Sequence, residues 1–303
     1  MTAKATGAQT ILSTARFACR EDVAVSVHIP INNIIPFSLV DGPGARCSVF
    51  VQGCNIQCAY CHNPETQRLC VGCGACVRAC PAKALKMVCG AVEWDQDTCV
   101  KCDTCIHVCP SHSSPRILYL DAKQVFKRVK SYMPFIRGVT CSGGECMLYP
   151  KFLSELFGLC RSVGLGCLID SNGTVDFTEH QDLLALSDGV MLDLKCWDDA
   201  WFVSLTGTDG KTVRKNLAFL AEQDKLTELR IIVTVDHNDP EAAVCGATEV
   251  LGEKVTSTRL RLMRFRHFGV CGEMEDAPSP TDERMNAMRE LAKSLGFGTV
   301  VVS

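Results

Sequence analysis

Residues 46–61 read RCSVFVQGCNIQCAYC, and this stretch joins a short apolar segment to three closely spaced cysteines. The segment RCSVFVQ predicts a strand that ends at Gly53. Cys54, Cys58 and Cys61 then form a Cys-x3-Cys-x2-Cys triplet. Three thiolates leave one iron of a 4Fe–4S cubane without a protein ligand, and an open coordination position is typical of a catalytic rather than a structural metal centre. We therefore expect a reactive cluster directly behind this strand.

Two further cysteine groups follow the triplet with identical spacing. They are Cys-x2-Cys-x2-Cys-x3-Cys-Pro runs, the spacing of bacterial ferredoxins, and they consist of Cys70, Cys73, Cys76 and Cys80, then Cys99, Cys102, Cys105 and Cys109. In two-cluster ferredoxins the fourth cysteine of each run serves the other cluster, so Cys109 would complete the first cluster and Cys80 the second. Residues 67–115 are thus predicted to be an inserted α+β bacterial-ferredoxin-like domain with two electron-carrying 4Fe–4S clusters.

Zinc and disulfides are the alternatives for so many cysteines. Zinc sites usually separate two Cys-x2-Cys pairs by a dozen or more residues, and a chain of this length can build a core without disulfides. The ten other cysteines show no pairing pattern and are expected to be buried free thiols: Cys19, Cys47, Cys89, Cys141, Cys146, Cys160, Cys167, Cys196, Cys245 and Cys271. Free thiols in this number favour a reducing, anaerobic compartment, hence the cytoplasm.

Charge and hydropathy exclude several classes of partner. The net charge of −3 and the lack of a long Lys/Arg run argue against nucleic-acid binding. No run of eighteen apolar residues is present, so no membrane span is expected. Residues 1–30 are expected to be an extension. Residues 1–20 contain basic but no acidic residues, as organellar targeting segments do, but a disordered or mis-assigned start is the favoured interpretation.

Strand-like and helix-like segments alternate in the rest of the chain. Strands are expected at 46–52, 138–141, 167–170, 189–195, 228–234 and 259–265, and helices at 151–164, 180–187, 213–223, 241–252 and 282–296. Such alternation predicts parallel strands with right-handed crossovers. The fold class is therefore α/β, a partial (β/α)6 TIM-like barrel made of residues 31–66 and 116–303.

Polar residues gather where these strands end. They comprise Ser142 to Glu145, Asp170 to Gly173, Asp193, Lys195 and, on the next strand, Arg230. Each of them alone could be a turn or a helix cap. Because chemistry in such barrels collects at the carboxyl ends of the strands, their succession there predicts one shared site.

Two of these motifs together resemble the radical SAM enzymes, whose fold is a barrel of the predicted type. Cys54-Asn-Ile-Gln-Cys58-Ala-Tyr-Cys61 is similar to the cluster motif of that superfamily, and Gly143-Gly144-Glu145 is similar to its S-adenosylmethionine motif. The resemblance implies that the open iron chelates the methionine moiety. Paired glycines let backbone carbonyls approach the ammonium closely, and Glu145 would add countercharge.

Within the superfamily, the chain resembles the glycyl radical enzyme activating enzymes over about residues 32–270. The hairpin Asp41-Gly42-Pro43-Gly44-Ala45-Arg46 is similar to a loop that binds the target's glycine segment. The resemblance makes Asp170 and Asp193 possible ligands of a monovalent cation. The implied cofactor-binding residues are Tyr60, Gly143, Gly144, Glu145, Asp170, Ser171, Asp193, Lys195, Arg230 and His267.

Two segments suggest the YjjW-type subgroup of activases, Ile34–Ser38 and Arg264–His267. One departure from the family pattern is Cys146, which stands where proline or alanine usually follows Gly-Gly-Glu.

The implied activity is reductive cleavage of S-adenosylmethionine to methionine and a 5′-deoxyadenosyl radical, which abstracts a Cα hydrogen from a glycine of a partner enzyme. The implied partners are a glycyl radical enzyme as protein substrate and ferredoxin or flavodoxin as electron donor; we expect a monomer. The first alternative is a radical SAM enzyme for a small molecule or a peptide, which the Asp41–Gly44 hairpin disfavours. The second is an iron–sulfur electron-transfer protein, which would gain nothing from an open iron.

Overall fold

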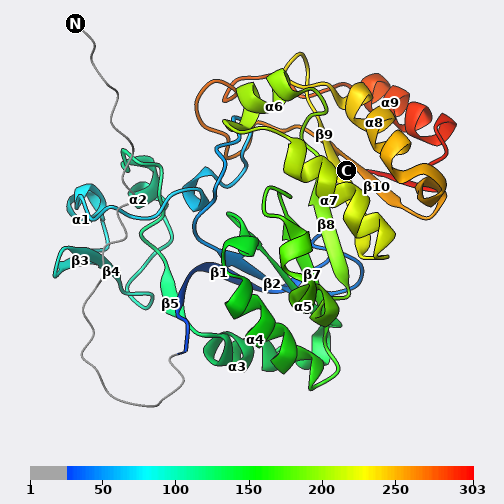
Figure 1. Ribbon diagram of the computed structural model, residues 1–303. Helices are drawn as coiled ribbons and strands as arrows, with labels where there is room; N and C mark the ends of the chain where they lie inside the picture. Colours follow the sequence, from blue (N-terminus) through cyan, green and yellow to red (C-terminus); the bar gives the residue numbers. More distant parts are fainter. Residues whose placement is uncertain (1–25) are drawn as a thin grey trace, which may run out of the picture.

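The computed structural model describes residues 26–303, and a curved, mainly parallel sheet of nine strands lies at its centre (Figure 1). The strand order is β11-β10-β9-β8-β7-β6-β2-β1-β5. The strands from β11 to β2 pair in parallel: β2 (Arg46–Val51), β6 (Gly138–Gly143), β7 (Gly166–Ser171), β8 (Gly189–Asp193), β9 (Leu226–Val233), β10 (Arg259–Arg264) and β11 (Thr299–Val302). Their carboxyl ends therefore meet at one edge of the sheet.

Helices cover the outer face of this sheet. They are α3 (Ala122–Lys130), α4 (Pro150–Arg161), α5 (Gln181–Leu186), α7 (Lys211–Glu222), α8 (Pro240–Leu251) and α9 (Asp282–Ser294), with α6 (Asp199–Thr206) above the strand ends (Figure 1). Short 3-10 helices lie at Pro64–Thr66, Met133–Phe135, Cys146–Leu148, Phe177–Glu179 and Gly252–Thr256. Local sequence fixes several helix starts: Asp121 and Gln124 form a capping box on α3, and Pro150 and Pro240 begin α4 and α8.

The core lies between the sheet and these helices. Val49 of β2, Val139 of β6 and Val190 of β8 are fully buried in one apolar cluster with Phe152 and Leu156 of α4. Alternate residues of the strands face the concave side, because successive side chains of a strand point to opposite faces. Arg46 and Ser48 of β2 are on that side.

The predicted α/β class and partial barrel are confirmed. Each expected strand and helix of the barrel is present, with ends that shift by a few residues. The prediction did not include β1 (Ile29–Ser38), β5 (Leu118–Leu120), β11, α3 or α6. β1 contains two prolines and two asparagines and pairs with β2 through register shifts, so it lacks the regular alternation that identifies a strand.

Antiparallel strands complete one edge of the sheet. β1 pairs antiparallel with both β2 and β5. The turn between β1 and β2 enters the concave face: a Cβ on Gly42, which has φ +117°, would lie 2.8 Å from Leu168 Cδ1 of β7 and 3.4 Å from Met191 Sδ of β8. The Asp41–Gly44 turn therefore forms part of the wall inside the barrel.

The segment predicted as an insert stands to one side of the barrel (Figure 1). It contains α1 (Ala75–Ala79), the hairpin of β3 (Leu85–Val88) and β4 (Ala91–Trp94), and α2 (Thr104–His107). Its own small core consists of Cys76, Leu85 and Cys105, with Trp94 and Ile106 packed against them. The domain boundaries predicted from the sequence stay a prediction.

Within residues 26–303, no helix is both long and apolar enough to cross a bilayer. The prediction about residues 1–20 lies outside the described residues, and β1 already begins at Ile29, inside the predicted extension.

Candidate functional site

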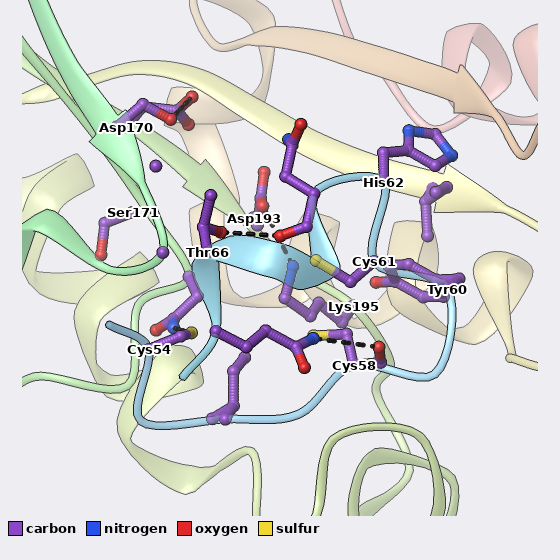
Figure 2. A pocket seen from close by; sticks show the side chains of 18 of the residues that line it. Cys54, Cys58, Tyr60, Cys61, His62, Thr66, Asp170, Ser171, Asp193 and Lys195 are labelled. Atoms are coloured by element: carbon purple, nitrogen blue, oxygen red, sulfur yellow. Dashed lines mark hydrogen bonds and ion pairs between the residues drawn. The ribbon is translucent and has the colours of Figure 1, made fainter. Parts of the chain in front are cut away.

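A cavity of about 210 Å³ lies at the carboxyl ends of the parallel strands (Figure 2). Every barrel strand from β2 to β10 contributes to it, directly or through the loop that follows. Its lining comprises Cys54, Ile56, Cys58, Tyr60, Cys61, His62, Asn63, Thr66, Gln67, Ser142, Gly143, Gly144, Asp170, Ser171, Asn172, Asp193, Leu194, Lys195, Arg230, Ile232 and Met263. The three triplet cysteines and most of the polar residues predicted at strand ends therefore share one cavity.

The loop after β2 brings the triplet to this cavity. Cys54 N donates to Gln67 O at 2.9 Å, and Gly53 N donates to Thr66 O at 2.7 Å, so the loop is closed on itself. Burial raises the pKa of Cys54 to about 11 and that of Cys58 to about 12. Partly buried thiols of this kind become thiolates when a metal replaces the proton.

Paired glycines allow the loop after β6 to lie directly against the cysteine loop. Gly143 has φ +115°, and a Cβ there would lie 2.3 Å from Val51 N. A Cβ on Gly144 would lie 2.1 Å from Gly53 O and 2.9 Å from Thr66 O. A side chain at Gly143 would collide with the backbone of β2, and one at Gly144 would push the two loops apart, which is the physical reason for glycine at both positions.

Glu145 holds the same loop to the loop after β7. Its Oε1 accepts hydrogen bonds from Ser171 Oγ at 2.9 Å and Met147 N at 2.9 Å, and its Oε2 accepts one from Asn172 N at 2.8 Å. Burial raises the pKa of Glu145 to about 7, against the effect of these donors. The carboxylate is not among the residues that line the cavity, and its role as countercharge to the co-substrate stays a prediction.

Asp170 and Arg230 form a buried ion pair across the strand ends. Arg230 Nη1 lies 2.9 Å from Asp170 Oδ1, and Ser142 Oγ donates to Asp170 Oδ2 at 3.0 Å. Burial raises the pKa of Asp170 above its ordinary value. The positive charge of Arg230 opposes this increase, and the negative charge of Asp193 adds to it. Arg230 also pairs with Glu228 at 2.8 Å.

Asp193 and Lys195 lie beside the cysteines. Lys195 Nζ is 3.0 Å from Asp193 Oδ2 and 5.6 Å from the centre of the Tyr60 ring. Burial opposes the charge of Lys195, but Asp193 and Tyr60 raise its pKa well above the ordinary value. Asp193 Oδ1 is buried and has no hydrogen-bond partner among residues 26–303. An unpartnered carboxylate oxygen at a cavity is suited to a cation or an ammonium group.

The donor set fits a cluster with one open iron. Three thiols, a fixed glycine loop and an unpartnered carboxylate oxygen meet at one cavity. In residues 26–303 no three His, Cys, Asp or Glu side chains converge as the ligands of a single ion do. The thiolates of a 4Fe–4S cluster each bind a different iron, so this spacing does not conflict with a cluster.

Comparison with known families agrees with this site. The model of the radical SAM superfamily matches residues 48–239, which is more than half of the chain and includes the triplet and the glycine pair. The chain belongs to the radical SAM superfamily. Membership implies a 4Fe–4S cluster and S-adenosylmethionine.

Curated relatives of this radical SAM protein activate glycyl radical enzymes. It is 31% identical to the benzylsuccinate synthase activating enzyme of Thauera aromatica, over 79% of this chain and 79% of the relative. It is 29% identical to the trans-4-hydroxy-L-proline dehydratase activating enzyme of Clostridioides difficile, over 89% of this chain and 97% of the relative. The chain is thus distantly related to the activases along most of their length.

Among solved structures, the Streptococcus suis SuiB complex with the precursor peptide SuiA has a similar fold. The TM-score is 0.54 at 12% identity, over 83% of this chain and 47% of that chain. At this identity the likeness concerns the fold alone.

Of the predicted cofactor residues, Glu145 and His267 do not line the cavity, and His267 lies at the surface. It is exposed and stacks on Phe268, with ring centres 4.7 Å apart. His62 lies at the cavity instead, and its Nε2 is 2.8 Å from Arg266 O. The position of His62 directly after Cys61 was the signal that could have identified it.

Several lining residues were not predicted as site residues, notably Gln67, Ser142, Asn172 and Met263. Ser142 and Asn172 belong to the polar segments Ser142–Glu145 and Asp170–Gly173, so their positions at strand ends could have identified them as site residues. Gln67 and Met263 join the cavity through folding alone.

Arg46, predicted to bind a partner, is only 5% exposed. Its Nε donates to Thr140 Oγ1 at 2.8 Å and its Nη2 donates to Val139 O at 2.7 Å, and Thr140 Oγ1 donates to Asp41 O at 2.6 Å. Burial lowers the pKa of Arg46. Arg46 therefore supports the Asp41–Gly44 turn from below.

Four cysteines of the two runs lie near one another, and of these Cys76 is in α1 and Cys105 in α2. Burial raises the pKa of Cys76 to about 11, and the thiols of Cys70, Cys105 and Cys109 raise it further, so these groups are neighbours. Because Cys105, which is expected at the other cluster, is also among these neighbours, the crossed ligand pattern of two-cluster ferredoxins stays a prediction.

Proposed function

We propose that this protein is a glycyl radical enzyme activating enzyme. The observation that carries the proposal is the cavity that combines the incomplete cysteine triplet with Gly143-Gly144 and the unpartnered oxygen of Asp193. The relatedness to activases along most of their length favours this activity over other radical SAM chemistry. The cluster and S-adenosylmethionine would supply the electron and the 5′-deoxyadenosyl radical that takes a hydrogen from the partner's glycine.

The residues of the chain bind and position these groups. Cys54, Cys58 and Cys61 would hold the cluster, and the backbone carbonyls of Gly143 and Gly144 would face the ammonium of the co-substrate. Asp193 Oδ1 would accept from that ammonium or bind a monovalent cation together with Asp170. Lys195 and Arg230 keep positive charge beside these carboxylates. Tyr60, Ser171 and, through Ser171, Glu145 would shape the rest of the subsite.

The eight cysteines at 70–109 would hold two 4Fe–4S clusters in an inserted domain at 67–115. Ser111 and His112, which follow Cys109, line a second cavity together with Cys58 and Cys61. This proximity supports electron transfer from a ferredoxin or flavodoxin through the insert to the triplet cluster.

The partner's glycine segment would enter the concave face of the barrel beside the Asp41–Gly44 turn. Asp41 is held there by Ser48 Oγ, which donates to its Oδ2 at 2.6 Å. Hydrogen abstraction requires near contact between the reacting atoms, so the glycine must come within the barrel mouth. Ile34–Ser38 and Arg264–His267 support the YjjW-type subgroup, with an anaerobic cytoplasm as the location.

The test compares reduced, reconstituted wild type with Cys58→Ala under strict anaerobiosis. Wild type is expected to form 5′-deoxyadenosine from S-adenosylmethionine. Cys58→Ala should lose this activity and about a third of the iron, because the insert clusters keep their ligands. Cys245, predicted from the sequence to be buried, lies exposed on α8, so Cys245→Ala is the matched control and should behave as wild type.

An organic-radical signal in electron paramagnetic resonance spectra of a co-incubated glycyl radical enzyme is the second readout. 5′-Deoxyadenosine without any radical on such a partner would favour a small-molecule or peptide substrate. Wild type that forms no 5′-deoxyadenosine, together with Cys58→Ala protein that transfers electrons as well as wild type does, would instead indicate an electron carrier.

A further inference from the structure

Asn172 follows β7 and connects the loop after that strand to the cysteine loop. It is 6% exposed. Its Oδ1 accepts from Thr174 N at 2.9 Å and from Thr174 Oγ1 at 2.6 Å. These two donors fix the orientation of the amide, so Nδ2 points toward the cysteine loop. Nδ2 lies 3.6 Å from Cys54 Sγ and 3.2 Å from Asn55 Oδ1.

The contacts around Asn172 form a closed ring. Asn55 Nδ2 donates back to Thr174 Oγ1 at 2.7 Å, so the side chains of Asn55, Asn172 and Thr174 hold one another. The backbone of Asn172 is fixed independently, because its N–H donates to Glu145 Oε2. One residue thus links the carboxylate of the Gly-Gly-Glu loop to the first cysteine of the triplet.

We propose that Asn172 is a positioning residue whose amide donates a hydrogen bond to the Cys54 thiolate and raises the reduction potential of the triplet cluster. The inference rests on the proposed function, since it presupposes that cluster. An added electron increases the negative charge on the sulfurs, and an N–H dipole directed at one of them stabilises the reduced state more than the oxidised state. Partners beyond the direct ligands tune metal sites in this way.

The structure favours this role over a purely local one. Thr174 donates both hydrogen bonds to Asn172 Oδ1, and Asn55 Oδ1 accepts from one N–H of Nδ2, so these loop contacts use only one of the two N–H groups of the amide. The other N–H is directed at Cys54 Sγ, which lies 3.6 Å from Nδ2. A purely local role would change the stability of the protein and leave the potential of the cluster unaltered.

The test is a redox titration of full-length, reconstituted protein, followed by electron paramagnetic resonance. The signal of the triplet cluster is the one that changes when S-adenosylmethionine is added. Asn172→Ala and Asn172→Asp are both expected to lower its midpoint potential. Loss of one hydrogen bond to a charged acceptor should change the reduction equilibrium about tenfold, which is about 59 mV for one electron. Asn172→Asp should shift it further, because a carboxylate near the thiolate adds repulsion.

Asn286→Asp is the control, because it adds the same charge at an exposed position of α9. Its potential should equal that of wild type. Thr174→Val keeps the Asn172 side chain but removes a donor that orients it, and it should give a smaller decrease. If neither Asn172 variant takes up iron, Thr174→Val decides: a lowered potential supports the proposal.

If both Asn172 variants take up full iron and have the wild-type potential, the inference is overturned. If the Asn172 variants lose iron, a wild-type potential in Thr174→Val overturns it instead. Failure of the proposed function looks different. In that case wild-type protein itself would have no cluster signal that responds to S-adenosylmethionine.

Discussion

Replacement of Gly144 by alanine tests how closely the glycine loop and the cysteine loop must approach. The backbone of Gly144 is not in the left-handed region, so the effect is purely steric. The new Cβ would lie 2.1 Å from Gly53 O, whereas ordinary contact begins at 3.4 Å, so the loops must separate by about 1.3 Å. The neighbours that it meets are backbone atoms of Gly53 and Thr66, which cannot rotate away.

Two magnitudes follow from this displacement. Overpacking of a buried site costs about 1–3 kcal/mol of the free energy of unfolding. A misplacement of about 1 Å near reacting groups reduces the rate about a hundredfold. We therefore expect Gly144→Ala to form 5′-deoxyadenosine about a hundred times more slowly than wild type, with iron content as a parallel readout.

Gly158→Ala is the matched control. Gly158 lies in α4, and a Cβ there meets nothing within 4 Å. Alanine should stabilise this helix by about 0.5–1 kcal/mol and leave the turnover unchanged. Equal stability and equal turnover of Gly144→Ala and wild type would refute the argument from close approach.

Three more measurements follow from the buried polar groups. Arg230→Met should lower the free energy of unfolding by about 3–5 kcal/mol in urea titrations, because it removes the ion-pair partner of the buried carboxylates of Asp170 and Glu228. Lys254→Met, which removes an exposed ion pair, is the control and should change this free energy by less than about 0.5 kcal/mol. The folded state raises the pKa of Glu145 from 4.5 to about 7. The contribution of protonated Glu145 to the free energy of unfolding is therefore full below pH 4.5. It falls by up to about 3 kcal/mol as the pH rises to about 7. The stability–pH profile of Glu145→Gln should lack this decrease. Asn216→Ala should lower the free energy of unfolding by about 2–4 kcal/mol in thermal unfolding, because three hydrogen bonds to the segment after β7, two of them buried, are lost.

The sequence anticipated the elements of the barrel whose pattern is set by local chemistry. Strands such as β8 are continuous apolar runs because both faces are covered, and helices such as α4 carry a regular apolar stripe. β1 was missed because its pairing is imposed by β2 and β5 and not by its own alternation.

The same distinction between local pattern and tertiary contact applies to the residues of the candidate site. The spacing of Cys54, Cys58 and Cys61 indicates a cluster because ligand spacing within one loop is a local property of the chain. The positions of Asp170, Asp193 and Arg230 at strand ends were also readable, since parallel strands place their carboxyl ends at one edge.

Only the tertiary structure decided what each polar side chain contacts. Glu145 belongs to a motif that suggests direct contact with the cofactor, but its carboxylate is occupied by Ser171 and two backbone N–H groups. His267 was expected at the cavity and lies exposed, while His62 reaches it. Sequence fixes the identity and local spacing of donors and acceptors, whereas their partners come from segments far apart in the chain. Those partners are set by how the loops pack at the strand ends, which no local pattern encodes.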